Sequence, residues 1–156
     1  MQECREVTLL IALGSDHAGY PLKEHIKKHL IEKGIEIIDM GCFSTDSAHY
    51  PEYGEKVARA VTGGRADLGV IVCGTGIGIS IAANKVSGIR AALCTDSYMA
   101  RMARLHNDAN ILALGARVVG MGVAEDIVDT FIHTSFEGGR HSERVDMIMR
   151  IKESSD

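Results

Sequence analysis

A cysteine and three glycines stand close together at residues 73–80, which read Cys-Gly-Thr-Gly-Ile-Gly-Ile-Ser. In a run of small residues at the start of a helix, backbone N–H groups point outward and bind an anion, either a phosphate or an oxyanion formed during a reaction. Cys73 stands just before the expected helix, where the helix dipole favours a thiolate. A thiolate beside oxyanion donors suits removal of a proton next to a carbonyl group. Taken alone, Cys73 is better explained as a buried residue that ends a strand, because cysteine is among the most buried residue types.

The same glycines fit the nucleotide-binding motifs poorly. The dinucleotide fingerprint G-x-G-x-x-G/A needs a small sixth residue, but that residue is Ile79 when counted from Gly74 and Ile81 when counted from Gly76. The sequence contains no Gly-Lys-Ser/Thr, which excludes a Walker-type loop. Asp96 follows at the spacing of a ribose-binding acid. A nucleotide-binding or regulatory module without catalysis, which would bind NAD or a nucleotide at this loop, is therefore kept as the alternative function.

Basic and imidazole side chains supply a second set of candidates. Arg140 and Arg144 are four residues apart at a helix start, which suits either a phosphate-binding fork or a solvated charged turn. Residues 106–108 read His-Asn-Asp and provide either an acid/base imidazole or a polar helix end. His25 and His29 share a helix face without an evident third ligand, so we interpret them as surface residues and not as a metal site.

Apolar runs and helical stripes alternate along the chain and place these residues. Strands are expected at residues 7–14, 35–40, 68–73, 89–94 and 109–114. Helices are expected from Pro21 to a C-cap at Gly34 and at residues 52–61, 77–85, 97–105, 123–133 and 142–152, with a long loop at 41–51. Repeated units of this length predict an α/β protein, a parallel sheet with helices on both faces. Its carboxyl edge would gather Ser15-Asp16-His17, Cys73, Thr95-Asp96 and Arg117.

Size and composition limit the class of protein. A length of 156 residues predicts one domain over 1–156, and a net charge of −4 excludes a broad basic surface for nucleic acid. None of the four cysteines forms a C-x-x-C pair, which favours a reduced cytoplasmic protein over a zinc ribbon. The apolar run at 7–13 is too short to span a membrane.

The motifs together resemble the ribose-5-phosphate isomerase type B family, which includes the galactose-6-phosphate isomerase subunits. The resemblance covers residues 7 to about 150, and residues 1–6 form a short N-terminal extension. It is carried by Ser15-Asp-His-Ala-Gly19, Tyr50-Pro51, the stretch from Cys73 to Lys85, Gly88-Ile-Arg-Ala91, His106-Asn-Asp108, Glu137-Gly-Gly-Arg-His141 and Arg144.

This resemblance implies a fold and a reaction. The fold would be a three-layer α/β/α Rossmann-like sandwich with a five-stranded parallel sheet. Cys73 would move a proton between C1 and C2 of a sugar phosphate through a cis-enediolate, with a hydrogen bond from Thr75. His106, with help from Asp16, would open the furanose ring. The enediolate oxygen would be held by the N–H groups of Gly74, Gly76 and Gly78, the phosphate by His17, Arg117, Arg140 and Arg144, and the sugar by Tyr50 and Asn107.

The resemblance also implies an assembly. The active sites would be shared between two subunits of a homodimer, with His106 reaching in from the neighbour, and no cofactor, metal, nucleic acid or membrane would take part. The amphipathic helix at 142–152 would pack on the partner subunit. The sequence leaves three questions open. They are the pairing of dimers into a tetramer, the order of the last two strands in the sheet, and a preference for a six-carbon sugar phosphate such as allose or galactose 6-phosphate.

Overall fold

The computed structural model describes residues 8–151, in which five parallel strands form one sheet in the order β2-β1-β3-β5-β4. The strands are β1 (Leu10–Ser15), β2 (Glu36–Asp39), β3 (Leu68–Cys73), β4 (Ala91–Leu93) and β5 (Ile111–Gly115). The predicted parallel α/β sandwich is confirmed. The last two strands lie in the sheet in the reverse of their order along the chain, so β5 pairs with β3 and β4 lies at the edge.

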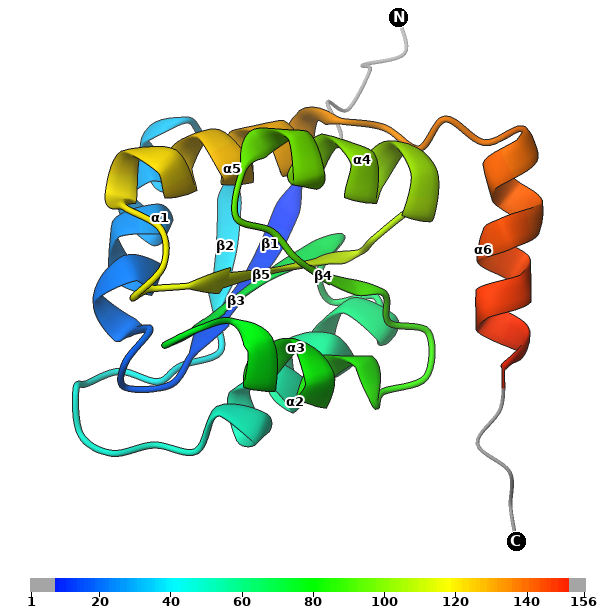
Figure 1. Cartoon of the computed structure of the whole chain (residues 1–156). Helices are drawn as coiled ribbons and strands as arrows, with labels where there is room; N and C mark the ends of the chain where they lie inside the picture. The colour runs from blue at the N-terminus through cyan, green and yellow to red at the C-terminus, as the bar shows by residue number, and fades with distance from the viewer. Residues whose placement is uncertain (1–7, 152–156) are drawn as a thin grey trace, which may run out of the picture.

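In the described part of the chain, six helices surround the sheet: α1 (Tyr20–Glu32), α2 (Tyr50–Thr62), α3 (Ile77–Asn84), α4 (Ser97–Asn107), α5 (Met121–His133) and α6 (Arg140–Arg150). Figure 1 shows α1, α5 and α4 on one face, α2 and α3 on the other, and α6 standing at one end. None of the helices within 8–151 is long and apolar enough to cross a membrane.

Two apolar cores fill the sandwich, one on each face of the sheet. Leu22, Ile26 and Leu30 form the predicted stripe of α1 and join residues of α4 and α5 in the first core. Val57 of α2 and Ile79 of α3 lie in the second. Because both faces are covered, all six residues of β3 are buried, as its continuous apolar sequence predicts.

Several predicted boundaries were wrong by one to three residues. Strand β1 begins at Leu10, while Val7 lies outside the described residues. Strand β4 covers only 91–93 instead of 89–94. It begins late because the N–H of Arg90 donates a hydrogen bond to the side chain of Asn110 and not to a neighbouring strand. Helices α2 and α5 begin two residues earlier than predicted. Helix α6 also begins two residues early, directly after two glycines at positive φ that turn the chain.

The histidines of α1 are a further correction. They are half-buried instead of free on the surface, because each meets a carboxylate of α5. His25 Nε2 lies 2.7 Å from Glu125, and His29 Nε2 lies 2.9 Å from Asp129. These pairs join the two helices on this face of the sheet.

Candidate active site

The predicted site lies where the strand order reverses between β1 and β3. In a parallel sheet, the chain leaves two such strands in opposite directions and opens a crevice at their carboxyl ends. Ser15 pairs with Val72, so the segments that begin at Asp16 and Cys73 emerge side by side. The sheet therefore brings the first and third predicted motifs together.

The loop after β3 wraps around the sulfur of Cys73. The side chain is 4% exposed, and the N–H of Gly76 donates to Sγ at 3.1 Å. Gly76 adopts φ +78°, and a Cβ there would lie 2.6 Å from Leu93 Cδ1 and 2.8 Å from the backbone of Leu114. Only glycine suits this position, because both the backbone angle and the space exclude a side chain.

Thr75 is exposed at the tip of this loop. Its Oγ1 accepts a hydrogen bond from the N–H of Ile77 at 3.2 Å, at the first turn of α3. Tyr50 lies against the same helix start, since its ring atoms are 2.7–3.0 Å from the position of a Cβ on Gly78. A hydroxyl, a phenol and the backbone donors of a helix start thus meet around Cys73.

The end of β5 fixes the other side of the loop. The N–H of Ala116 donates to Cys73 O at 2.9 Å, and the N–H of Arg117 donates to Gly74 O at 3.0 Å. The guanidinium of Arg117 lies over Gly74, 3.3 Å from the position of a Cβ there. This cation therefore lies next to the glycine loop that follows β3, as predicted from the strand ends.

Asp16 and His17 follow β1 in ordered positions. Buried Asp16 accepts a hydrogen bond from the N–H of Gly19 at 2.9 Å and so shapes the entry into α1. His17 Nδ1 lies 3.1 Å from the N–H of Ala48, in the loop that leads to α2. This contact leaves Nε2 of His17 as the nitrogen that is not engaged by the loop.

Asp96, the possible ribose-binding acid of the alternative function, has a structural partner instead. Its Oδ1 accepts the N–H of Met99 at 2.8 Å and caps the start of α4. The feature that favoured a nucleotide site is therefore explained by helix capping.

The remaining predicted residues lie at the opposite edge of the sheet. Helix α4 begins after the carboxyl end of β4 and runs back to the start of β5, so His106 and Asn107 reach the amino edge (Figure 1). Arg140 and Arg144 are exposed on α6, which stands at that same end. Within one chain, these four residues are not brought together with Cys73.

At the amino edge, His106 stacks on a histidine to which the sequence assigned no role. The rings of His106 and His141 are 4.1 Å apart and nearly parallel, at 12°. His141 is 4% exposed, and its Nε2 has no hydrogen-bond partner among residues 8–151. Burial, with a smaller electrostatic contribution from His106, lowers the pKa of His141 from its ordinary value. The buried ring of His141 thus packs against the ring of His106.

Glu137 completes this group and was also missed. Its Oε2 lies 3.9 Å from His106 Nε2 and 3.7 Å from His141 Nε2, and its backbone N–H donates to Leu105 O. The spacing of four residues between Glu137 and His141 was the available signal. Within 8–151 this is the one group of His, Cys, Asp and Glu side chains close enough to hold a metal ion. Because the two rings are nearly parallel, their nitrogen lone pairs run side by side and do not converge on one ion.

The buried thiols differ in their surroundings. Burial, with a smaller contribution from Asp96, raises the pKa of Cys94 to about 11, so it remains a thiol at neutral pH. Cys73 instead receives a backbone N–H and ends at the crevice. Cys73 is therefore the better placed of the two for a reaction.

Comparison with known proteins identifies the family. The sequence model of the Ribose/Galactose Isomerase family matches residues 11–148. The chain is 51% identical to Ribose-5-phosphate isomerase B of Escherichia coli over 92% of this chain and 96% of that protein. It is 42% identical to the galactose-6-phosphate isomerase subunit LacB of Clostridium acetobutylicum over 88% and 79% of the two chains. The solved structure of Clostridium thermocellum Ribose-5-Phosphate Isomerase B superposes with a TM-score of 0.90 at 59% identity, covering 90% and 95%. The chain belongs to the ribose/galactose isomerase family.

Proposed function

We propose that this protein interconverts D-ribose 5-phosphate and D-ribulose 5-phosphate through a cis-enediolate, as an aldose–ketose isomerase of the pentose phosphate pathway. The observation that carries the proposal is the sulfur of Cys73, buried at the strand switch point with the N–H of Gly76 3.1 Å away. The named activities of the relatives support it.

In the proposed reaction Cys73 acts as the base. Its thiolate takes the proton from C2 of the open-chain aldose, which gives a cis-enediolate with its negative charge on O1, and O1 then gains a proton. O2 then loses its proton as C1 receives one, which gives the ketose, so no redox partner is consumed. The N–H groups of Gly74, Gly76 and Gly78 and the hydroxyl of Thr75 stabilise the negative oxygen of the enediolate.

We further propose that each active site combines residues of two copies of the chain. Cys73, Asp16 and Arg117 belong to the carboxyl edge of one copy, and His106 with Asn107 to the amino edge of the other. His106 opens the furanose ring with help from Asp16. The phosphate is held by His17 and Arg117 of one copy and Arg140 and Arg144 of the other, and the sugar by Tyr50 and Asn107.

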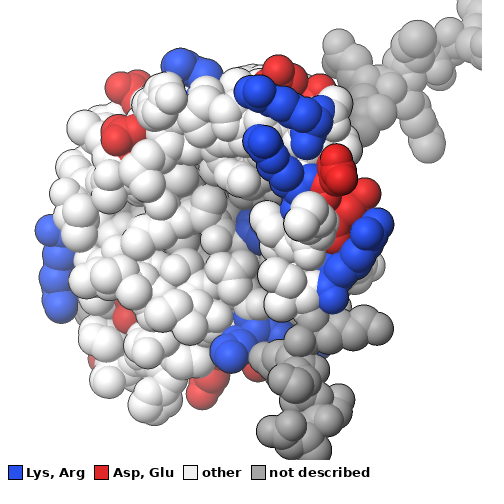
Figure 2. All heavy atoms as spheres, turned by 45° about the vertical axis from the view of Figure 1, so that its right-hand side comes forward, with Lys and Arg blue, Asp and Glu red and all other residues white. Residues whose placement is uncertain are grey.

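Exposed apolar side chains support a homodimer in which α6 packs on the partner. Met147 is 59% exposed and Ile148 46% exposed on α6, while Ile77 and Ile81 are exposed on α3. Figure 2 shows that much of the side carrying α6 is free of Lys, Arg, Asp and Glu, with a hollow beside a group of charged side chains. A second copy would cover such a surface. The cysteines within 8–151 are free thiols, which suits the cytoplasm.

The first experiment measures conversion of ribose 5-phosphate in EDTA by the wild type, Cys73→Ala and Cys94→Ala. We expect activity in the wild type and Cys94→Ala and a loss of at least 1000-fold in Cys73→Ala, because the base is removed. Turnover retained by Cys73→Ala would exclude it as the base. An inactive wild type would move the proposal to six-carbon sugar phosphates, which the similarity to the galactose-6-phosphate isomerase subunit favours as the second candidate.

Mixing two inactive variants tests the shared site. A mixed dimer of Cys73→Ala and His106→Asn has one site with both residues intact and one with neither. Random pairing of equal amounts should therefore restore about a quarter of the wild-type activity, if each site works alone. Activity that stays at the level of the separate variants would mean that each site is built within one chain.

A further inference from the structure

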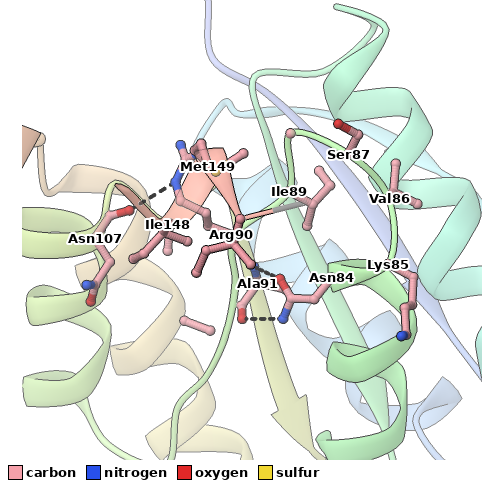
Figure 3. A pocket seen from close by; sticks show the side chains of 14 residues that line it. Asn84, Lys85, Val86, Ser87, Ile89, Arg90, Ala91, Asn107, Ile148 and Met149 are labelled. Atoms are coloured by element: carbon pink, nitrogen blue, oxygen red, sulfur yellow. Dashed lines mark hydrogen bonds between the residues drawn. The ribbon is translucent and has the colours of Figure 1, made fainter. Parts of the chain in front are cut away.

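Arg90 connects the end of α4 to the rest of the amino edge. It precedes β4 and lines a cavity of about 870 Å³ between α6 and the connection from α3 to β4 (Figure 3). Its Nε donates to Asn107 O at 3.0 Å and Asp108 O at 3.1 Å, and a terminal nitrogen donates to Asp108 O at 2.8 Å. The other terminal nitrogen reaches the sulfur of Met149 on α6 at 3.3 Å. One guanidinium thus holds the last carbonyl groups of the helix that carries His106.

The turn that Arg90 holds is strained. Asp108 ends α4 at φ 44° and ψ 43°, and it is the one residue other than glycine with positive φ within 8–151. The left-handed region is unfavourable for a residue with a Cβ and persists where surrounding contacts impose it. Here the N–H groups of Asp108 and Ala109 close the helix end on the carbonyl groups of Arg104 and Ala103. Side chains add to this: Arg104 donates to Asp108 Oδ1 at 3.0 Å and to Ala109 O at 2.6 Å, and Arg90 supplies the bonds described above.

The anchor of Arg90 does not depend on α4. Its backbone N–H donates to Asn110 Oδ1 at 2.8 Å, and its carbonyl accepts the N–H of Asn110 at 3.0 Å. The backbone of Arg90 is therefore held at the start of the sheet, and the charge of its guanidinium faces the negative end of the helix dipole. This arrangement can set the direction in which the end of α4 points.

We propose that Arg90 is a positioning residue for the isomerisation: it holds the strained end of α4 so that His106 and Asn107 enter the active site of the second copy. The inference rests on the proposed function, which gives Arg90 no role. Arg90 itself touches backbone carbonyl groups and not the sugar phosphate, so its removal acts on the catalytic step through His106. Arginine suits this task better than lysine, because two nitrogens of its rigid planar fork bond the two carbonyl groups, whereas lysine carries its donors on one nitrogen of a flexible chain.

The test uses a rescue that only a positioning role allows. Arg90→Met should lower kcat at least tenfold while KM changes less than threefold, and Arg90→Lys should lie between this variant and the wild type. Asp108→Gly alone should stay within threefold of the wild type, because glycine adopts the left-handed turn without strain. In the double variant Arg90→Met/Asp108→Gly, kcat should rise at least fivefold above that of Arg90→Met.

Matched controls separate this result from loss of fold or assembly. Arg59→Met removes an exposed arginine on α2 that pairs with Glu55 and should leave kcat unchanged. Light scattering and urea unfolding should show each variant folded, with the oligomeric state of the wild type. A fall in kcat that glycine at 108 does not rescue, a change confined to KM, or dissociation of the dimer in Arg90→Met would each overturn the inference. Failure of the proposed function would appear separately, as a wild type without isomerase activity.

Discussion

Replacing Gly115 by alanine tests how tightly the end of β5 fixes the position of the loop after β3, which carries the proposed base. A Cβ at this position would lie 2.6 Å from Thr75 O, 2.7 Å from Thr75 C and 2.9 Å from Thr75 Cα. All three are backbone atoms, so no side chain can rotate away. The loop must move by about 0.5–1 Å to restore van der Waals contact, which is a typical overpacking distortion.

Both stability and catalysis should suffer from that movement. Overpacking of this kind costs about 1–3 kcal/mol, and two hydrogen bonds that fix the loop, from Ala116 to Cys73 and from Arg117 to Gly74, are strained with it. If the loop holds the enediolate, a shift of this size lowers kcat/KM about 100-fold. Urea unfolding and the ribose 5-phosphate assay measure the two effects.

Gly122→Ala is the matched control, since no atom lies within 4 Å of a Cβ there and the residue is exposed in the first turn of α5. Alanine should stabilise this helix by a few tenths of a kcal/mol and leave activity unchanged. A Gly115→Ala protein with the stability of the wild type and activity within threefold of it would refute the reasoning. That result would show that the loop is soft and that its position does not govern the reaction.

Two further predictions concern charges away from the loop. Lys23→Met should lower the free energy of unfolding in urea by about 2–3 kcal/mol, because Lys23 is 1% exposed and donates to both carboxylate oxygens of Asp39, at 2.7 and 2.9 Å. The control Lys28→Met changes a side chain that is 79% exposed and should alter the free energy of unfolding by under about 0.5 kcal/mol. Equal losses of stability in Lys23→Met and Lys28→Met would contradict the argument that burial of Lys23 makes its ion pair important. Because the pKa of His141 is lowered, the unfolded chain binds more protons than the folded one below about pH 6.5, so stability should fall as the pH drops through this range. His141→Asn should flatten this slope in unfolding experiments between pH 5 and 7, and an identical slope would count against it.

The sheet and the carboxyl edge could be predicted from the sequence because their signals are local. Continuous apolar runs such as 68–73 can be buried only between two helical layers, and residues just after such strands must meet at one edge. This logic correctly grouped Asp16, Cys73 and Arg117. The catalytic and binding roles assigned to them stay predictions.

The features that the sequence did not reveal depend on contacts between distant residues. The burial of Lys23 depends on Asp39 at the end of β2, on the ring of Tyr20 in its own helix, and on the ring of Phe43, which the loop after β2 brings close to it. The stacking of His106 on His141 requires α6 to stand beside the end of α4, and no periodicity within either helix encodes that. The late start of β4 likewise depends on Asn110, which lies 20 residues from Arg90.

The proposed sharing of the site follows from the geometry of a parallel sheet. Every strand ends at the same edge, and the helix that follows must return the chain to the other edge before the next strand begins. Cys73 ends a strand, whereas His106 ends a returning helix, so one sheet length separates them in any single chain of this topology. A two-fold axis that sets the carboxyl edge of one copy against the amino edge of the other removes this separation twice, once for each site. The proposed reaction would then require assembly of two copies, and assembly would not serve stability alone. Arg90 would act where the amino edge of one copy meets the carboxyl edge of the other.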